Sequence, residues 1–146
     1  MTSTDANMLA KRCADAMWAD DCASRGLGME LLDIAPGRSR VAMTVTEAMT
    51  NGHGMCHGGF IFTLADSAFA FACNTYNERV VAQHCAVTYL RPGRLGMRLT
   101  ARATERSRAG RSGIYDVTVT DEAGTQIAEF RGHSRALGTK FFENLP

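Results

Sequence analysis

Residues 51–74 read NGHGMCHGGFIFTLADSAFAFACN, and this stretch decides the fold. Residues 59–73 form the longest apolar run of the chain, with Asp66 as its one charged residue. The run lacks the alternation of a half-buried strand, is rich in Ala and Phe, and is long enough for about four helical turns. Because apolar residues lie on every side of such a helix, it must be surrounded by protein. The sequence therefore predicts a buried central helix with a carboxylate in its middle.

The size and charge of the chain narrow the class of protein. Its 146 residues fit one domain over 1–146, long enough to bury roughly 68–70% of the unfolded surface. A net charge of +1 gives no reason to expect nucleic acid or an anionic membrane as a partner. The apolar run is shorter than the ~20 residues of a membrane span, and no charged-then-apolar leader opens the chain. Five scattered cysteines are typical of reduced thiols, so we expect a cytoplasmic protein.

The rest of the chain reads as one further helix and six strands. Ser3, Thr4 and Asp5 are candidate N-caps for an outer helix over about residues 6–19. Alternation and turn residues predict these strands: 27–34 with a bulge at Leu31-Leu32, 41–46, 80–90, 98–103, 114–120 and 126–137. The third strand must stop at Arg91-Pro92-Gly93, because proline cannot donate to the ladder.

These elements predict an α+β fold, a curved antiparallel sheet wrapped around the long central helix. The connections among the last four strands are short, so we expect these strands to form an antiparallel meander. Helix residues that face away from the sheet need a cover, and a second subunit is the simplest one. The sequence therefore also predicts an oligomer.

Three motifs carry a resemblance to a known family. The chain contains N-x5-HGGFIFTLAD, then VTYLRPG, then RAGRSGIYDVTVTDEAGT. This pattern, over about residues 27–137, resembles the hot-dog-fold acyl-CoA thioesterases, in particular the PaaI/PaaD branch of phenylacetic acid degradation. The resemblance implies hydrolysis of (hydroxy)phenylacetyl-CoA or a similar aryl-acyl-CoA to the free acid and coenzyme A. It also implies that no metal or other cofactor is used, and that homodimers pair into homotetramers.

The resemblance also implies roles for four residues of the quoted stretch. Asp66 would be the catalytic carboxylate and Gly59 the oxyanion donor, while Asn51 and His57 would be supporting polar residues. In some relatives a Ser or Thr on the strand after the helix orients the attacking water. Here Gln83 and His84 occupy that neighbourhood, so no residue is assigned to that role.

The chemistry of Asp66 supports its role independently. An ionised carboxylate inside an apolar helix is costly to desolvate, so it persists when it is paired, exposed in a cleft or functional. As a general base it would activate water, and as a nucleophile it would form a mixed anhydride with the acyl group. A carboxylate hydrogen-bonded across a subunit interface is the structural alternative, and the sequence leaves these readings open.

Gly58 and Gly59 at the start of the helix have a physical use in acyl transfer. The first helical turn has unpaired N–H groups, and the helix dipole there favours the negative charge of an oxyanion. The alternative is that the glycines only allow a tight turn into the helix. His57 would orient the acyl carbonyl or hold the loop, and Asn51 would hold a water or cap the loop.

Two other readings of the same loop are weak. His53, Cys56 and His57 invite a metal site, but they lie in a Gly-rich turn with no second pair of ligands. Cys56 beside His57 invites a thiol nucleophile, but sequence neighbours rarely form a nucleophile and its base. We therefore predict no metal and assign no role to the thiol.

Arginines gather near the predicted strand ends and could hold the phosphates of coenzyme A. Arginine recognises phosphate through its planar fork, although charged strand ends also simply keep a sheet soluble. The residues concerned are Arg91, Arg94, Arg106, Arg108, Arg111 and Arg135. Among these we favour the turn from Arg108 to Arg111, with Arg91 as a further candidate.

Two alternatives to a thioesterase stay open, a hot-dog dehydratase acting on 3-hydroxyacyl thioesters and a non-catalytic acyl-CoA sensor. The dehydratase signature has Glu on the helix and proline in the preceding loop, and the sequence has neither.

If the protein is a thioesterase, Gly59 and Asp66 lie roughly 10 Å apart on one straight helix. We therefore expect a composite site, with Asn51, His57 and Gly59 from one subunit and Asp66 from its partner.

Overall fold

The helix predicted from the apolar run is α3 (Gly58–Cys73) in the computed structural model, which describes residues 1–145. It begins at Gly58, the first residue of the glycine pair predicted at its start, and His57 is its N-cap. Most of its positions are buried: Ile61, Leu64, Ala65, Ser67, Ala68, Phe69, Phe71, Ala72 and Cys73. The prediction of a buried central helix is therefore confirmed.

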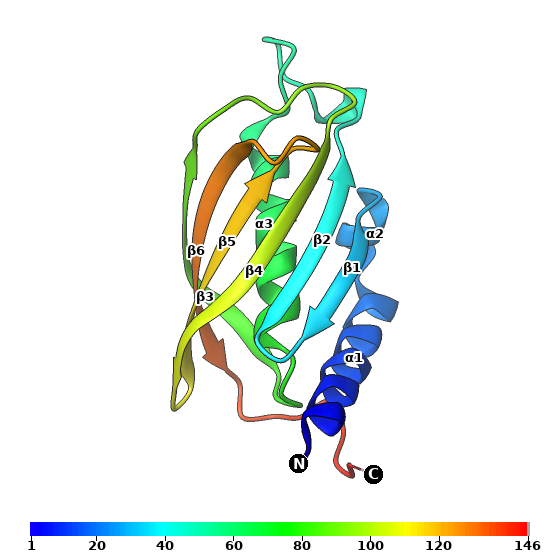
Figure 1. Ribbon diagram of the computed structural model, residues 1–146, viewed down its shortest axis with the longest axis vertical. Coiled ribbons are helices and arrows are strands. Elements are labelled where there is room, and N and C mark those ends of the chain that lie inside the picture. The colour runs from blue at the N-terminus through cyan, green and yellow to red at the C-terminus, as the bar shows by residue number, and fades with distance from the viewer. Residues whose placement is uncertain (146) are drawn as a thin grey trace.

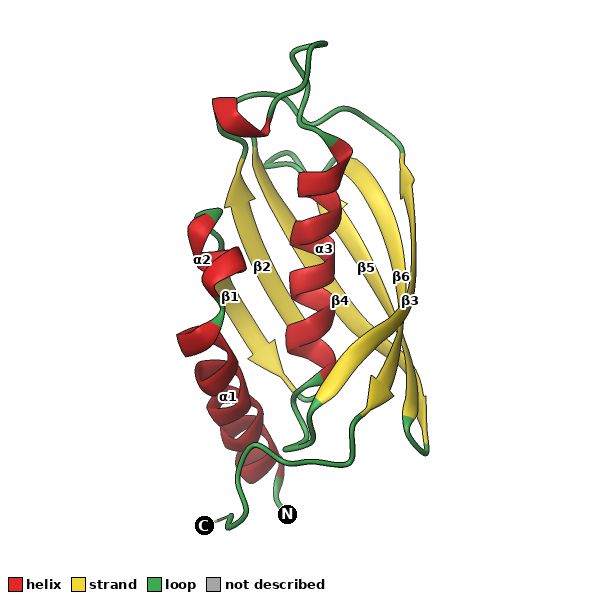
Figure 2. Ribbon diagram, turned by 180° about the vertical axis from the view of Figure 1, so that it is seen from behind, coloured by secondary structure: helices red, strands yellow, loops and turns green. Residues whose placement is uncertain are grey.

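One antiparallel sheet of six strands curves around α3 (Figure 1). Its strands are β1 (Glu30–Ala35), β2 (Arg38–Thr44), β3 (Val80–Tyr89), β4 (Arg98–Ala109), β5 (Ser112–Thr120) and β6 (Gln126–Ala136). Seen from behind, α3 lies along the concave face of the sheet (Figure 2). This is the predicted α+β arrangement, and it is the hot-dog fold.

The predicted meander of the last four strands is wrong for the first of them. The sheet order is β1-β2-β4-β5-β6-β3, so β3 pairs with β6 and not with β4. Only β4, β5 and β6 follow one another as neighbours. The chain leaves β3 at one edge of the sheet and crosses to the middle through residues 90–97. Eight residues can span roughly 26 Å, while three strand spacings need only about 14 Å.

The N-terminal region differs from the prediction in two details. Helix α1 (Ser3–Asp20) is capped by Thr2, whose hydroxyl accepts from the Asp5 N–H while the Asp5 carboxylate accepts from the Thr2 N–H. A short helix α2 (Cys22–Gly26) follows, so the expected strand from residue 27 begins only at Glu30. The predicted bulge is confirmed, as a register shift between Leu31 and Asp33.

The core lies between α3 and the inward side chains of the sheet. Strands β2, β4, β5 and β6 each send alternate apolar residues toward the helix. Phe69 of α3 packs against Tyr115 and Phe130, with ring centroids 5.6 and 5.8 Å apart. No helix within residues 1–145 is both long and apolar enough to cross a membrane.

One side of α3 is left without a cover. Gly59 is exposed, and Phe62, Thr63, Asp66 and Ala70 are only half-buried. Their spacing places them on one side of a helix with 3.6 residues per turn, and we call this side the open stripe of α3. Both predicted reaction groups, Gly59 and Asp66, belong to the open stripe.

Candidate active site

Asp66 lies near the middle of the open stripe, two turns from the start of α3. Burial alone shifts its acidity, raising the pKa of the carboxyl above its usual value. No hydrogen-bond donor or cation within residues 1–145 stabilises its charge. Such a carboxylate is expensive to keep ionised, and a raised pKa with no structural partner is typical of a functional group.

Two cysteines lie close enough to Asp66 to sense its charge. Burial first, and the Asp66 carboxylate further, raise the pKa of Cys85 on β3. Burial is again the largest cause for Cys73, and together with lesser effects that include Asp66 it raises the pKa of that thiol to about 12. Both thiols are therefore protonated at neutral pH. These neutral thiols therefore give the carboxylate no counter-ion.

His57 caps the start of α3. Its Nδ1 accepts the N–H of Gly59 at 2.9 Å, while its carbonyl oxygen accepts the N–H of Phe60 at 3.0 Å. Thr63 donates its hydroxyl to the carbonyl oxygen of Gly59 at 2.8 Å. The N–H predicted to bind an oxyanion is thus at the exposed helix start, but in this structure it is bonded to His57.

Tyr89, at the end of β3, reaches the same turn of the helix. Its hydroxyl donates to the carbonyl oxygen of Gly58 at 2.8 Å. The sequence reasoning gave Tyr89 no role, although it lies within the motif VTYLRPG. Thr63 and Cys85 were missed as well. The spacing of four residues between Gly59 and Thr63 on one helix could have indicated the first, whereas the position of Cys85 near Asp66 depends on the packing of β3 beside α3.

Asn51 holds the loop that precedes α3. Its Oδ1 accepts the N–H groups of His53 at 2.9 Å and Met55 at 3.3 Å, and its own N–H donates to the Met55 carbonyl at 2.8 Å. A side-chain oxygen that accepts from residues two and four positions ahead stabilises a turn. Asn51 therefore shapes the loop, and only its amide NH₂ is left for a substrate or water within the described chain.

Gly59 and Asp66 point to the same side of α3 but do not meet. Seven residues of helix separate their backbones by roughly 10 Å. An aspartate side chain spans only part of this distance, so one chain does not bring both groups to one carbonyl carbon. His57 and Asn51, by contrast, lie with Gly59 at the same end of the helix.

The candidate arginines lie at opposite ends of one chain. Arg91 follows β3, near the loop that contains Cys56, because the Cys56 N–H donates to Gly93 at 2.7 Å. Arg108 and Arg111 lie at the hairpin of β4 and β5, at the far end of the sheet in Figure 1. There the Arg108 guanidinium stacks 3.5 Å from the centre of the Tyr76 ring. A single subunit therefore does not gather these arginines around one ligand.

The remaining candidates of the loop and strand lie away from the open stripe. His84 packs edge-on against His133, its neighbour on β6, with ring centroids 5.4 Å apart, and Gln83 is exposed at a bulge of β3. Burial raises the pKa of Cys56, which disfavours a thiolate nucleophile there. Within residues 1–145, no three His, Cys, Asp or Glu side chains gather as metal ligands.

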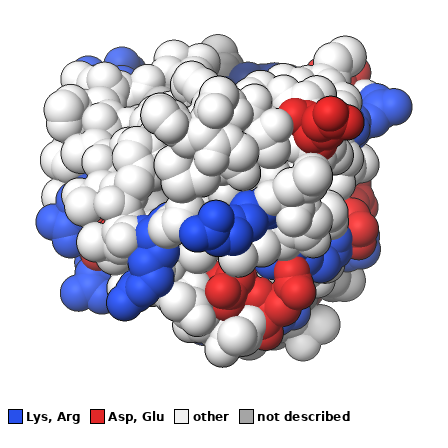
Figure 3. Space-filling model, turned by 90° about the horizontal axis from the view of Figure 1, so that it is seen from above, with Lys and Arg blue, Asp and Glu red and all other residues white. Residues whose placement is uncertain are grey.

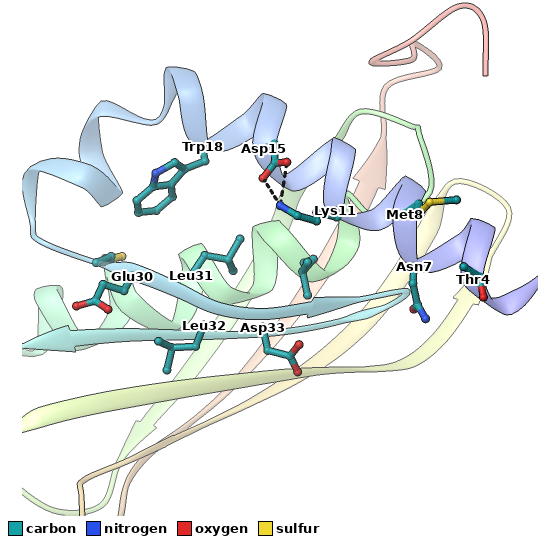
Figure 4. A pocket seen from close by; sticks show the side chains of 12 residues that line it. Thr4, Asn7, Met8, Lys11, Asp15, Trp18, Glu30, Leu31, Leu32 and Asp33 are labelled. Carbon is teal, nitrogen blue, oxygen red and sulfur yellow. Dashed lines mark hydrogen bonds and ion pairs between the residues drawn. The ribbon is translucent and has the colours of Figure 1, made fainter. Parts of the chain in front are cut away.

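The surface offers a large groove that is not the candidate site. It lies between α1 and β1, encloses about 820 Å³, and contains Trp18 and Leu31 among its lining residues (Figure 4). The ion pair of Lys11 and Asp15, at 3.1 Å, lies along its helical side. None of the predicted reaction residues lines this groove.

The end of the molecule that carries the loop before α3 is shown in Figure 3. A broad area there has no charged side chain, and both basic and acidic side chains lie around it. An uncharged area of this kind suits an apolar acyl group.

Comparison with known proteins identifies the family. The family model described as thioesterase superfamily matches residues 53–128. The acyl-coenzyme A thioesterase PaaI of Escherichia coli (strain K12) is 42% identical over 125 residues, which cover 86% of this chain and 89% of PaaI. The structure of the E. coli PaaI protein from the phenylacetic acid degradation operon superposes with a TM-score of 0.90 at 40% identity, covering 92% and 97% of the two chains.

Two further solved structures share the fold. A mutant of the phenylacetic acid degradation protein PaaI from Thermus thermophilus is 41% identical, with a TM-score of 0.77 over 80% of this chain and all of that one. A protein of Streptococcus mutans UA159, solved bound to acetyl CoA, has a TM-score of 0.74 at 24% identity over 77% and 90% of the chains. The chain therefore belongs to the thioesterase superfamily, in the PaaI branch of the hot-dog acyl-CoA thioesterases.

Proposed function

We propose that this protein hydrolyses (hydroxy)phenylacetyl-CoA or a similar aryl-acyl-CoA to the free acid and coenzyme A. The observation that carries the proposal is Asp66, a carboxylate with a raised pKa and no partner within residues 1–145, on the open stripe of α3. The E. coli relative is an acyl-coenzyme A thioesterase, and its solved structure is that of a protein from the phenylacetic acid degradation operon, which supports an aryl-acetyl thioester of coenzyme A as substrate. Phe62 and the inward side of β3 offer apolar surface beside the carboxylate for an aromatic acyl group.

The active site of the proposed enzyme is formed by two subunits. Because Gly59 and Asp66 of one helix lie too far apart, two α3 helices must pack antiparallel about a two-fold axis. For Gly59 of one chain to face Asp66 of the partner subunit, the axis must pass between Phe62 and Thr63. Asn51, His57 and Gly59 then come from one subunit, and the carboxylate comes from its partner.

The edge strand β3 supports the same dimer. The N–H of Leu90 donates to the carbonyl of Ile127 on β6, so the backbone groups of every second residue back to the bulge at Ala82–His84 point to β6 and those between them point outward. Beyond the bulge the alternation shifts by one residue. The outward backbone groups of Val80 are bonded by the Asn74 side chain, whereas those of Cys85, Val87 and Tyr89 are left at the free edge of the described sheet. An unpaired edge of this kind pairs readily with a second copy of itself.

The helix and the strand agree on where the two-fold axis passes. Tyr89 lies level with Gly58, to which it is hydrogen-bonded, and Cys85 lies near Asp66, whose charge it senses. An axis at Val87 places Tyr89 opposite the partner subunit's Cys85. The axis that brings Gly59 to the partner subunit's Asp66 also brings the Tyr89 end of β3 to the partner subunit's Cys85. One dimer therefore satisfies both the helix pairing and the strand pairing. Two such dimers would pair into the homotetramer that the family resemblance implies.

Two chemical routes fit this arrangement. As a general base, Asp66 takes a proton from water, whose oxygen bonds to the thioester carbon. The carbon–sulfur bond then breaks, and the thiolate of coenzyme A takes the proton. As a nucleophile, the carboxylate oxygen itself bonds to the carbon and expels the thiolate, and water hydrolyses the resulting anhydride. In both routes the carbonyl oxygen becomes negative at the Gly59 N–H.

The two-fold axis would also bring candidate arginines of the two subunits to the same site. It reverses the strand direction, so the partner's hairpin approaches the end of the sheet that carries Arg91. Arg91 of one subunit, with Arg108 and Arg111 from the partner subunit, would then border one site. Guanidinium groups there suit the phosphates of coenzyme A.

The test is a substrate panel. Release of free thiol is measured with phenylacetyl-CoA, 4-hydroxyphenylacetyl-CoA and acetyl-CoA, and hydration is measured with crotonyl-CoA. We expect the highest kcat/KM with an arylacetyl thioester and no hydration. Hydration of crotonyl-CoA without thiol release would identify a dehydratase, and saturable binding without turnover would identify a sensor. Light scattering on the same sample tests the assembly, and a monomer with full activity would exclude the shared site.

A further inference from the structure

The peptide unit between Gly58 and Gly59 is hydrogen-bonded at both ends. Its carbonyl oxygen, on Gly58, accepts the Tyr89 hydroxyl at 2.8 Å, and its N–H, on Gly59, donates to His57 Nδ1 at 2.9 Å. Two side chains, one before the helix and one from the edge strand, thus hold a single peptide plane. The N–H of this plane is the group proposed to bind the oxyanion.

Both glycines leave room for these contacts. A Cβ on Gly58 would lie 2.9 Å from the Cζ atom of the Tyr89 ring, and a Cβ on Gly59 would lie 3.0 Å from His57 Nδ1. Neither glycine has a positive φ, so the backbone conformation does not explain them. The close approach of Tyr89 and His57 does explain them. The two glycines therefore make room for the groups that hold the peptide.

We propose that Tyr89 is a positioning residue, which orients and polarises the Gly58–Gly59 peptide so that its N–H binds the thioester oxyanion. This inference rests on the proposed function. A hydroxyl that donates to a peptide carbonyl draws electron density toward the oxygen and makes the N–H at the other end a stronger donor. The bond also fixes the direction of the N–H before substrate arrives, and a preoriented donor needs no reorganisation during the reaction.

In the resting chain, His57 accepts the hydrogen bond that the substrate oxygen would accept during the reaction. Its Nδ1 accepts the N–H that the carbonyl oxygen of the thioester must reach. When the oxygen enters, the N–H passes from the imidazole to it, and the Tyr89 bond keeps the peptide from turning. The N–H is therefore satisfied by His57 in the resting chain, at the exposed start of the helix.

The position of Tyr89 in the proposed dimer fits this role. It lies on the free edge of β3 and points inward, toward the helix. The two-fold axis that pairs Gly59 with the partner subunit's Asp66 also places Tyr89 opposite the partner subunit's Cys85. In this dimer the hydroxyl of Tyr89 thus lies near the partner subunit's Asp66 and near the Gly59 amide that stabilises the oxyanion.

The first test compares two tyrosine variants that each lose one hydroxyl and keep the ring. Tyr89→Phe removes the bond to Gly58, whereas Tyr115→Phe removes a bond to Glu105 in the core. We expect Tyr89→Phe to lower kcat about 3- to 10-fold with KM nearly unchanged, which is what the loss of one hydrogen bond amounts to. Tyr115→Phe should lower the melting temperature and leave kcat within about twofold of wild type.

The second test observes the peptide without turnover. In an isotope-labelled sample, the amide proton and nitrogen shifts of Gly59 report how strongly its N–H is polarised. We expect Tyr89→Phe to move both Gly59 resonances, while Tyr115→Phe leaves them in place. An unchanged kcat, a rise in KM alone, or unmoved Gly59 resonances would overturn the inference. In the same assays Asp66→Asn tests the proposed function separately. If Asp66→Asn is inactive and Tyr89→Phe is fully active, only the role of Tyr89 is wrong.

Discussion

Asp66 and Asp116 show how two aspartates of one chain can have opposite effects on stability. Hydrogen bonds from Arg131, at 2.6 and 2.9 Å, lower the pKa of Asp116, so its charge stabilises the fold. Burial without a partner raises the pKa of Asp66, so its charge destabilises the fold. A chain that keeps an unpaired carboxylate on its central helix gives up stability there, which is the expected signature of a reaction group.

The stability effect predicts a pH dependence. Between the ordinary pKa of 3.8 and the raised folded value, the folded chain binds more protons at Asp66 than the unfolded chain. Its contribution to the free energy of unfolding therefore falls as pH rises through this window, and the loss is constant above it. We expect Asp66→Asn to melt at a higher temperature than wild type at pH 7, with the difference vanishing below pH 3.8.

The same variant also tests catalysis. Asp66→Asn should lose at least ~10²-fold in kcat, as is usual when a general base is removed.

Asp116→Asn is the matched control for both parts of this prediction. Its folded pKa is lowered, so it should melt below wild type at pH 7 and keep its activity. Circular dichroism at a series of pH values and the thiol-release assay measure both variants. A folded Asp66→Asn with near-normal kcat would remove Asp66 from the mechanism.

At the scale of elements, the sequence predicts what each segment does more readily than where it lies. The apolar run from residue 59 to 73 could be read because its length and lack of alternation are local properties. Tyr89 and Gly58 lie 31 positions apart, and their contact exists only after β3 has packed beside α3. The position of β3 at the edge of the sheet could not be predicted from the sequence either. The eight-residue connection after β3 is long enough to reach several different strand positions. Its exposed residues, such as Val81, are typical of an edge.

The free edge of β3 gives an element-scale prediction. At Val87 the N–H points away from β6, so proline there removes a donor that the subunit itself does not use. We expect Val87→Pro to stay folded, to lose the dimer and to lose activity with it. At Ala86 the N–H points to β6, and Ala86→Pro should instead unfold the chain. Light scattering and circular dichroism separate these outcomes, and a Val87→Pro dimer with normal activity would place the subunit contact elsewhere.

At the scale of the whole molecule, we propose that the site belongs to a pair of chains. Asp66 and Gly59 could be named from their positions in one helix, but their separation of roughly 10 Å becomes useful only when a second helix runs the other way. The open stripe of α3, the free edge of β3 and the two distant groups of arginines are each incomplete in one chain. A single two-fold axis would complete all three, which is why we place the reaction between subunits.

A mixed dimer tests this arrangement directly. Asp66→Ala removes the carboxylate and Asn51→Ala weakens the loop before α3, so each variant alone should be inactive. When the two are co-assembled, a mixed dimer contains one site with Asn51 and Gly59 from one chain and an intact Asp66 from the other. Random pairing makes half of the dimers mixed, each with one working site of two, so about a quarter of wild-type activity should return. Mixed dimers isolated through two affinity tags should show half of the wild-type kcat, and no recovery in them would place the whole site within one chain.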